Sequence, residues 1–588
     1  MDECSMLSSA WMQKKQWIIK PPDERSAQLA RSLNVSTLLA QMLINRGITD
    51  AETGAIFLRP RLTELIPPEQ MPGVERAVQR VKRAVENREK VTIYGDYDVD
   101  GITGVAILWQ ILRLLDADVD YYVPHRIDEG YGLNPEAVRL LADSGTKLLI
   151  TVDCGITALR SAELARQLDL DLIITDHHHP DPDLPEAVAI VHPAMEADYP
   201  NQEPAGAMVA FKLAWAIANQ FNPGRRLEPK LRDFMLDATS LAAMGTVADI
   251  VDLRGENRIL TSYGLKSLPD CRLSGIQALI ESAGLTGHGL ETFHVGFRLA
   301  PMLNAAGRMG HARLAVELLT SGSPSRSTQI AQYLKEQNSR RQQYERKIFK
   351  QACNIILSKG LNHPDQRSIV LADPEWHGGV IGIVASRIVD KFSRPTIMIN
   401  AADNESGFAQ GSARSIPGFS LLDAIKACSK HLKTFGGHEM AAGITIAPEK
   451  IEPFAADFED YARQKLGQHD VVTRIHIDAE TPLSELRKET VDELRMLEPF
   501  GQGNPEPVFA TKGVRLACPP RRVGSGGDHL QLTITDGPAT MRCIGFRFGK
   551  LEKKLLDRES FNVAYRPHIN TYNGGNNVEL ILTDIQLD

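Results

Sequence analysis

Short apolar runs alternate with helix-length stretches between residues 91 and 320. The five runs are Val91–Tyr94, Tyr121–Val123, Lys147–Val152, Leu172–Thr175 and Val188–Val191. Gly, Pro or Asp bounds each run, and an apolar stretch long enough for a helix, Ile102–Leu115, lies between the first two. Strands that alternate with helices predict a parallel sheet with right-handed crossovers. We therefore expect an α/β domain over residues 91–320.

The pattern changes on both sides of this domain. Residues 1–90 are helix-like and polar, with a break at Ile66–Pro68, and we interpret them as an N-terminal helical cap region that leads into the first domain. Residues 321–354 predict a connecting helix, because 325–350 contain neither Gly nor Pro. Residues 355–468 predict a second, smaller α/β domain, with strands at Ser368–Ala372 and Thr396–Ile399.

Strand-like segments dominate residues 469–588. They are His529–Thr535, Thr540–Phe548, Asn562–Ile569 and Val578–Asp584. Short strands with Gly turns predict a small closed β-domain.

Composition narrows the class of protein. With 588 residues, 43% apolar and 24% charged, the chain suits a soluble protein of several domains. We find no apolar run of about 18 residues and no secretory signal, so we expect no membrane span. Seven cysteines, an odd number without a C-x-x-C pair, favour a reducing cytoplasm over a disulfide framework or a structural zinc site. The net charge of −8 gives no global support for a nucleic-acid partner.

Acidic residues follow three of the predicted strands. The segments are G-D-Y-D-V-D-G (Gly95–Gly101), D-C-G (Asp153–Gly155) and D-H-H-H (Asp176–His179). Because ligands bind outside the carboxyl ends of parallel strands, these segments should meet in one crevice. A fourth acid, Asp249 in G-T-V-A-D, ends another apolar stretch, and we expect it at a strand end of the same sheet.

The residue types in this crevice predict a metal centre. Several carboxylates repel each other unless a cation neutralises them, and carboxylates with imidazole suit a divalent ion such as Mn2+. Two ions bridged by one carboxylate are common in phosphoester hydrolysis. Taken alone, each segment is more often a helix cap, a turn or a solvated loop.

Basic and glycine-rich segments predict phosphate contacts. N-A-A-G-R (Asn304–Arg308), S-A-R (Ser412–Arg414) and G-G-H-E-M-A-A-G (Gly436–Gly443) offer donors beside small residues, although each alone favours a turn. Residues 508–568 carry eleven Lys and Arg against five acids. The aromatic residues in or beside these strands would stack single-stranded bases or form a core; they are Phe546, Phe548, Tyr565 and Tyr572.

These motifs together resemble the DHH phosphoesterase superfamily. The four acidic segments carry the resemblance to its DHH domain, and Trp376–Arg387, S-A-R-S and G-G-H-E-M-A-A-G resemble its DHHA1 domain. Glu498–Phe509 resembles the start of an OB-fold domain found in the superfamily's single-strand-specific DNA exonucleases. The resemblance implies a parallel-sheet DHH domain, joined by a long helix to a smaller α/β DHHA1 domain and followed by a β-barrel OB-fold domain.

The resemblance also implies roles for single residues. It implies two ions, Mn2+ or Mg2+, held by Asp96, Asp98, Asp153, His177 and Asp249, with Asp153 as the bridge. Asp98, Asp153 and His178 would be catalytic, with His178 against the phosphate or a metal, while Asp100 and Asp176 would orient their neighbours. The expected contacts to DNA or its terminal phosphate are Arg126, Asn304, Arg308, Ser412, Arg414 and His438. His192 and Met208 depart from the family's pattern, and His179 is given no role.

The function implied is a processive 5′-to-3′ exonuclease that hydrolyses single-stranded DNA to mononucleotides in DNA repair, recombination and mismatch repair. A single-strand-binding protein and a RecQ-type helicase are the implied protein partners, and we expect a cytoplasmic monomer. Two alternatives stay open here: a phosphodiesterase for short oligonucleotides or cyclic dinucleotides, and a non-catalytic binding protein. The basic tail argues against the first, and the intact set of metal carboxylates argues against the second.

Overall fold

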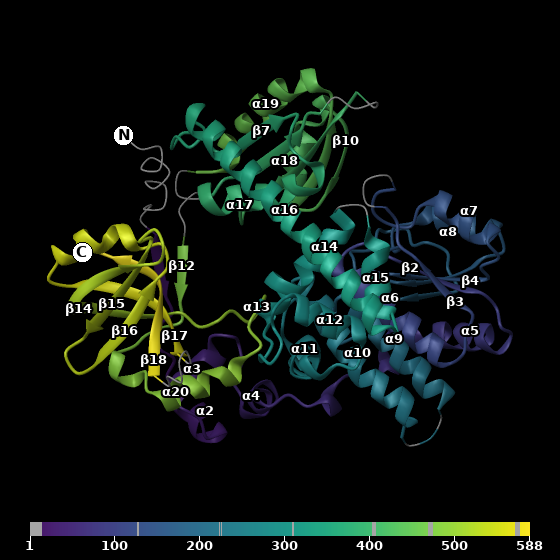
Figure 1. The fold of residues 1–588 in the computed structure, drawn as a ribbon, viewed down its shortest axis with the longest axis horizontal. Coiled ribbons are helices and arrows are strands. Elements are labelled where there is room, and N and C mark those ends of the chain that lie inside the picture. The colour runs from purple at the N-terminus through teal and green to yellow at the C-terminus, as the bar shows by residue number, and fades with distance from the viewer. Residues whose placement is uncertain are drawn as a thin grey trace. The chain divides into compact units, whose positions relative to one another are not determined.

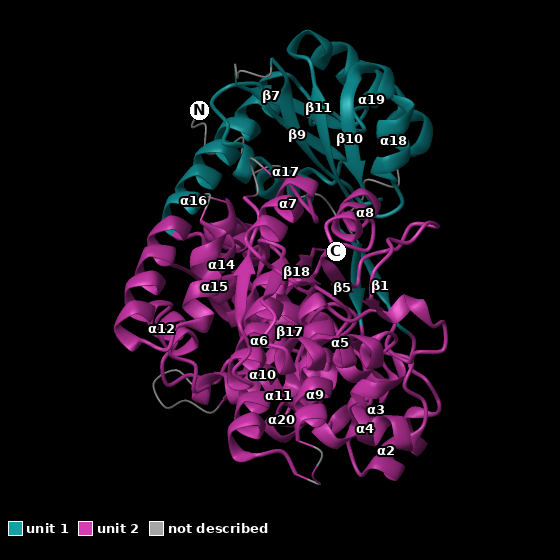
Figure 2. Ribbon diagram, turned by 90° about the vertical axis from the view of Figure 1, so that its right-hand side faces the viewer, with its two compact units in different colours: residues 1–20, 339–477 teal, residues 21–338, 478–588 magenta. Residues whose placement is uncertain are grey.

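The computed structural model describes residues 15–125, 129–222, 224, 226–308, 311–402, 407–467, 474–570 and 577–587. The chain forms two compact units (Figures 1 and 2). One comprises Pro21–Asn338 and Asp478–Asp588, and the other comprises Met1–Lys20 and Ser339–Ile477. Within the described part of the chain, no helix is both long enough and apolar enough to cross a bilayer.

A five-stranded parallel sheet forms the centre of the first unit. Its order is β3 (Val119–Tyr122), β2 (Val91–Gly95), β4 (Leu148–Val152), β5 (Asp171–Thr175) and β6 (Ala189–Val191). These strands confirm the five predicted apolar runs. β4 is buried along its whole length, as expected for a central strand covered on both faces.

Helices cover both faces of this sheet. Ile93 and Ile150 share one core with α5 (Val74–Glu86), α6 (Val99–Leu114), α9 (Gly206–Phe221) and α10 (Pro229–Ala248). Tyr94 and Leu149, the next residues along the strands, pack with α7 (Pro135–Asp143) and α8 (Leu159–Gln167). Alternate side chains thus enter opposite cores, which explains why β2 and β4 carry apolar residues on both faces.

Further helices complete the part of this unit that surrounds the parallel sheet and lead out of it. They are α11 (Gly255–Ser267), α12 (Ser274–Ser282), α13 (Thr292–His294), a π-helical turn (Val295–Leu299), α14 (Ala300–Arg308) and α15 (Ala312–Thr320). The predicted connecting helix is present as α16 (Pro324–Ser358), which begins and ends a few residues later than the sequence indicates. The residue limits of the domains stay a prediction.

The second unit contains a mixed sheet. Its order is β10 (Leu432–Gly437), β11 (Ala441–Ile446), β9 (Ala409–Arg414), β8 (Thr396–Asn400) and β7 (Ile369–Asp373), with only β7 and β8 parallel. Its helices are α17 (Gly378–Phe392), α18 (Leu421–Ala427) and α19 (Ile451–Lys465). S-A-R lies in β9, so a turn was the wrong expectation there. The glycine-rich stretch Gly436–Gly443 does contain a turn, at residues 438–440 between β10 and β11. Glycine weakens a strand pattern, yet an ideal Cβ on Gly411 would lie 2.7 Å from Ile444, so this ladder leaves no room for a side chain there.

A short parallel ribbon also belongs to the second unit. β1 (Gln16–Ile19) pairs with β12 (Arg474–Ile477), and the Lys20 amide donates to the Ile477 carbonyl at 2.9 Å.

A closed five-stranded barrel forms the C-terminal part of the first unit, which confirms the predicted β-domain. Its strands are β14 (Phe509–Val523), β15 (His529–Thr535), β16 (Thr540–Gly545), β18 (Asn577–Gln586) and β17 (Phe561–Asn570), and β14 also pairs with β17 to close it. β14 was not predicted, because Pro519 and Pro520 interrupt its pattern at a register shift.

The aromatic residues of the barrel divide between core and surface. Tyr565 is fully buried, and its hydroxyl lies 2.7 Å from the Thr511 hydroxyl, so base stacking by Tyr565 is excluded. Phe548 packs against the same core, whereas Phe546 is 54% exposed. Tyr572 lies outside the described residues.

The N-terminal helices pack on this barrel. α2 (Ser26–Leu33), α3 (Thr37–Ile44) and α4 (Ala51–Leu58), purple in Figure 1, contribute Leu39 and Met42 to a core shared with Phe509 and Phe561. The interpretation of residues 1–90 as one cap leading into the first domain was therefore wrong for these helices. Only α5 and the preceding turn join the core of the parallel sheet.

Candidate metal centre

Loops at the carboxyl ends of three neighbouring strands meet beside the parallel sheet. Asp96 and Asp98 follow β2, Asp153 follows β4, and His177 and His178 follow β5. Asp98 caps α6, because its carboxylate accepts hydrogen bonds from the Asp100 and Gly101 amides at 2.9 and 3.1 Å. Residues that are far apart in the sequence are thus assembled by strand order alone.

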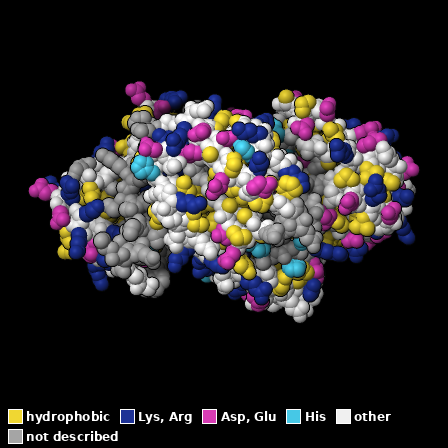
Figure 3. Space-filling model, turned by 90° about the horizontal axis from the view of Figure 1, so that it is seen from above, with side chains coloured by type: hydrophobic (Ala, Val, Ile, Leu, Met, Phe, Trp, Pro, Cys, Tyr) yellow, Lys and Arg dark blue, Asp and Glu magenta, His cyan; other side chains and the backbone are white. Residues whose placement is uncertain are grey.

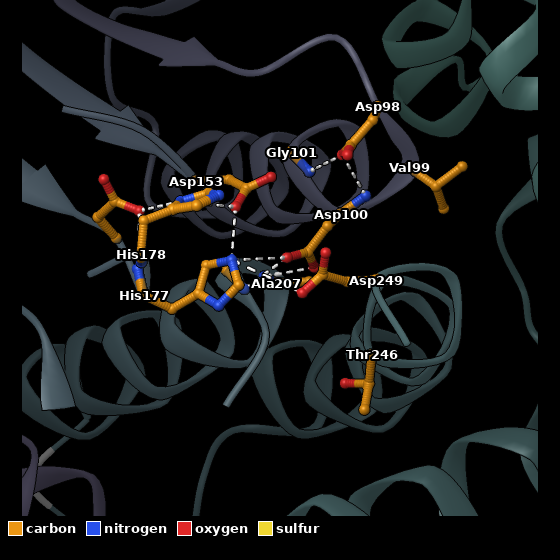
Figure 4. Close-up of polar contacts among 12 residues, drawn as sticks. Asp98, Val99, Asp100, Gly101, Asp153, His177, His178, Ala207, Thr246 and Asp249 are labelled. Carbon is orange, nitrogen blue, oxygen red and sulfur yellow. Dashed lines mark hydrogen bonds and ion pairs between the residues drawn. The ribbon is translucent and has the colours of Figure 1, made fainter. Parts of the chain in front are cut away.

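The donor atoms form three overlapping sets, each within 4.8 Å. The sets are Asp96, Asp98 and Asp153; Asp153, His177 and His178; and Asp100, His177 and Asp249. Figure 4 shows the His177 ring between Asp153 and Asp249. Asp153 belongs to two sets and faces His177 across 3.0 Å. One carboxylate therefore lies where two ions would share it.

Asp249 reaches this cluster from a helix, so its expected position at a strand end was wrong. It is the C-cap of α10, and its carboxylate lies 3.7 Å from Nε2 of His177. The apolar stretch before it is a buried helix, and periodicity alone does not separate such a helix from a buried strand.

The electrostatics of the cluster fit a bound cation. Asp153 is 3% exposed, and burial raises its pKa, as do the charges of Asp100, Asp98, Asp96 and Asp249. Burial and Asp98 raise the pKa of Asp249 to about 7, while burial and His178 lower the pKa of His177 to about 4. Oδ1 of Asp153 and Nε2 of His177 are buried and make no hydrogen bond within the described part of the chain. A divalent ion would satisfy both atoms and neutralise the repulsion.

Two further aspartates orient the cluster. The Asp100 carboxylate accepts hydrogen bonds from the Gly206 and Ala207 amides at 2.5 and 2.9 Å, which anchors the start of α9. Asp176 accepts from the amides of Ile156, His177 and His178.

Asp176 also fixes the ring of His178. Their atoms Oδ1 and Nδ1 lie 2.8 Å apart. Burial opposes the charge of Asp176, but the hydrogen bond with His178 lowers its pKa to about 2. Burial likewise opposes the charge of His178, but Asp176 raises the pKa of His178 to about 8.

Tyr131 belongs to this site and was missed from the sequence. Its hydroxyl donates to the Asp153 carbonyl at 3.2 Å and lies 3.1 Å from Nδ1 of His178. The sequence signal for it is the G-Y-G segment. Both of its glycines have positive φ, so the loop is tight and holds the one aromatic ring in place.

The departures from the family pattern have structural explanations. His192 lies with Nε2 2.8 Å from the His178 carbonyl, so it supports the second histidine. Met208 is buried in α9. His179 is exposed.

The expected phosphate contacts divide between the two units. Asn304 and Arg308 lie on α14 in the unit of the metal centre, and the Asn304 side chain accepts from the Val99 amide at 3.2 Å. Ser412 and Arg414 lie on β9 in the other unit, where the guanidinium donates to the Ser412 hydroxyl at 3.1 Å.

The remaining two phosphate candidates have less support. His438 follows β10 in the unit of Ser412 and is exposed. Arg126 lies outside the described residues. A joint grip on a phosphate by residues of both units stays a prediction.

Three family models match the chain. The DHH family N-terminal domain matches residues 90–239, the DHHA1 domain matches 365–464, and the RecJ OB domain matches 477–584.

Relatives and solved structures agree with these models. The single-stranded-DNA-specific exonuclease RecJ of Bacillus subtilis is 38% identical over 97% of this chain and 71% of its own length. The crystal structure of Thermus thermophilus RecJ with Mn2+ matches with a TM-score of 0.82 and 32% identity, over 97% of this chain and 80% of that one. The Mg2+ complex matches with a TM-score of 0.77 and 30% identity, over 97% and 78%. Identity and coverage of this extent show that the chain belongs to the RecJ family of exonucleases.

Proposed function

We propose that this chain is a two-metal exonuclease that hydrolyses single-stranded DNA from the 5′ end to mononucleotides. The observation that carries the proposal is the position of Asp153, which belongs both to the set with Asp96 and Asp98 and to the set with the two histidines. A shared, buried carboxylate between two donor sets is the arrangement that phosphoester hydrolysis with two ions needs. The relatives named above act on single-stranded DNA.

The residues fit Mn2+ or Mg2+, the ions named for the two Thermus structures. Asp96, Asp98, Asp153, His177 and Asp249 would hold two ions. Bound there, the ions would stabilise charge on the phosphate oxygens and lower the pKa of water.

The other side chains position the reacting groups. Asp176 and Tyr131 hold the ring of His178, so that it can donate a hydrogen bond to the scissile phosphate. Asn304 and Arg308, on the helix beside the first acidic loop, are proposed to grip the backbone or the terminal phosphate. Ser412, Arg414 and His438 are proposed to act on the same strand from the second unit.

The finer parts of the proposal rest on the family resemblance. They are the 5′ polarity, the mononucleotide product, and the role in DNA repair, recombination and mismatch repair. The cytoplasmic location, the monomeric state and the contacts with a single-strand-binding protein and a RecQ-type helicase have the same support.

One oligonucleotide labelled at either end tests the central claim. It is digested with Mn2+ beside a matched duplex, with Asp153→Ala as the inactive control. We expect early release of mononucleotide from the 5′ label alone, and none from the duplex or with the control. Metal-independent binding without cleavage would favour a non-catalytic protein. Cleavage restricted to fragments of a few nucleotides would favour a small-substrate phosphodiesterase.

A further inference from the structure

Two phenylalanines near the metal centre are unusually exposed. Phe293 is 56% exposed and Phe297 is 70% exposed, and their rings stack with centroids 5.0 Å apart at an interplanar angle of 27°. We call this pair the aromatic platform. Large apolar side chains gathered on a surface commonly mark an interaction site, whereas single ones need no explanation.

The backbone holds the platform firmly. Phe297 lies in the π-helical turn Val295–Leu299, whose two end residues are fully buried. Just before it, the Thr292 hydroxyl donates to the Phe500 carbonyl at 2.6 Å. Short π-helical turns inside helices occur frequently at functional sites. The two exposed rings therefore stand on a backbone turn that is anchored at both ends, so binding would not have to order this part of the backbone.

The platform lies beside the metal centre. An ideal Cβ on Gly296 would lie 4.0 Å from Val247, so the π-helical turn lies against the last turn of α10. Two residues later, Asp249 enters the metal cluster. Ile250, the next residue, is 67% exposed with φ of +61°, a backbone conformation that branched residues rarely adopt. The turn that carries Phe297 is therefore packed against the end of α10, next to Asp249 and Ile250.

Charged side chains of both signs lie around the platform. Phe293 also lines a cavity of about 620 Å³ between the catalytic half and the barrel, where Glu291, Glu498 and Glu506 lie together with Lys266 and Arg495. Burial raises the pKa of Glu498 and Glu506, and the charge of Glu291 adds to both shifts. Arg495 and Arg566 pair with Glu498 and Glu506 at 3.5 and 3.3 Å, so charge does not decide the occupant. An aromatic ring accepts the face of any base, and bases are therefore the part of a strand that fits the platform.

We propose that Phe293 and Phe297 form a stacking platform for unpaired bases of the substrate strand next to the metal centre. This inference rests on the proposed nuclease function and assigns part of its substrate selectivity. In a duplex the base faces are covered by their neighbours, so the platform would engage only a single strand. On the face drawn in Figure 3, basic and acidic side chains are interspersed over the described residues, so charge alone gives that face no strong preference for DNA.

The test compares the full chain with Phe293→Ala/Phe297→Ala, with Phe293→Trp/Phe297→Trp and with a control. Leu140→Ala is the matched control, because Leu140 is an exposed apolar residue of α7, 57% exposed. Binding of a single strand with phosphorothioate ends, which resist digestion, is followed with Mn2+ present by fluorescence anisotropy. Quenching of 2-aminopurine placed along the strand reports stacking directly.

We expect the double alanine variant to bind roughly 5- to 150-fold more weakly for each stacked base that is lost. It should also lose the 2-aminopurine quenching, while the tryptophan variant and Leu140→Ala keep both. Hydrolysis of a dinucleotide should stay unchanged in Leu140→Ala, since that residue is no part of the site.

Unchanged affinity and quenching in the double alanine variant would overturn the proposal. So would a loss of self-association in sedimentation with normal DNA binding, because the platform would then be a protein interface. The readouts are binding and stacking, so failure of the proposed function is recognised separately, by the absence of cleavage in the unmodified chain.

Discussion

Replacement of Arg258 by methionine should loosen the attachment of the barrel to the catalytic half. Arg258 lies on α11 and is 2% exposed, with its guanidinium 3.8 Å from the ring centroid of Phe57. It donates to five backbone carbonyls at 2.7–3.5 Å, those of Phe57, Met496, Leu497, Glu498 and Pro499. Four of these carbonyls belong to the segment that leads into the barrel.

The size of the effect follows from these contacts. Four of the hydrogen bonds are 3.2 Å or shorter, and a bond from a charged donor contributes roughly 1.5–3 kcal/mol. The gross gain is therefore roughly 6–12 kcal/mol, from which the burial of one charge removes several kcal/mol. Methionine fills a similar volume but leaves the carbonyls without donors, so we expect a net loss of about 3–5 kcal/mol.

Hydrogen exchange measured by mass spectrometry checks this locally. The amides of Glu498 and Asn504 are bonded within the segment, at 3.0 and 3.1 Å, and are protected only while it stays docked. Their protection should fall by roughly two to three orders of magnitude, since 1.4 kcal/mol is tenfold. Arg254→Met is the matched control on the same helix, because Arg254 is exposed and donates one hydrogen bond, to Gly503. If Arg258→Met changed protection no more than Arg254→Met, the buried guanidinium would not be what holds the segment.

Four further predictions concern the metal centre. Mn2+ uptake should release protons near pH 7 and weaken below that pH, because the pKa of Asp249 is about 7 without the ion and the pKa of Asp153 is also raised. Calorimetry in buffers of different ionisation enthalpy measures this proton release. Equal binding heats in all buffers would contradict the prediction. For the same reason the metal-free chain binds these protons more tightly than the unfolded chain does, so its stability should fall as the pH rises from about 4 towards 7, and a flat thermal-melt series would refute this. Asp153→Asn should lower the rate of single-turnover cleavage by at least roughly 10³-fold, as expected when a bridging ligand of both ions is lost. It should also raise the melting temperature of the metal-free chain, because it removes one of the carboxylates that repel each other. A variant that cleaves normally would exclude Asp153 as the bridge. Tyr131→Phe should lower kcat roughly fivefold, in line with the loss of one hydrogen bond of about 1 kcal/mol. It should also shift the basic limb of the pH–rate profile, because Tyr131 contacts His178. An unchanged profile would show that Tyr131 does not position His178.

The parallel sheet could be predicted because its signal is local. β2, β4 and β5 are short, mostly apolar and followed at once by acids, so strand ends and chemistry are visible together. Asp249 was expected with the other acids because it ends an apolar stretch, but it was expected on the wrong element. The last part of α10, residues 238–248, carries no charged side chain, and its pattern resembles a buried strand.

The interactions that could not be predicted are long-range. The packing of Leu39 and Met42 against Phe509 joins residues that are separated by most of the chain. The spacing of apolar residues along the sequence does not indicate such a long-range contact. β14 was missed because two prolines interrupt its pattern, although they lie at a shift in register where no ladder bond is required. Tyr131 was missed because a single aromatic residue in a glycine loop carries no spacing that indicates a metal site.

The shared core of the N-terminal helices and the barrel has a consequence for synthesis on the ribosome. Leu39 and Met42 emerge early, but Phe509 and Phe561, which cover them, emerge more than 460 residues later. At roughly 5–20 residues per second, these apolar helices wait on the order of 20 to 90 s for their partner. The core of the parallel sheet needs no residue beyond Leu334 and can form meanwhile. The nascent chain therefore carries a folded catalytic half together with N-terminal helices whose apolar face is still exposed. A chaperone would be needed at these helices.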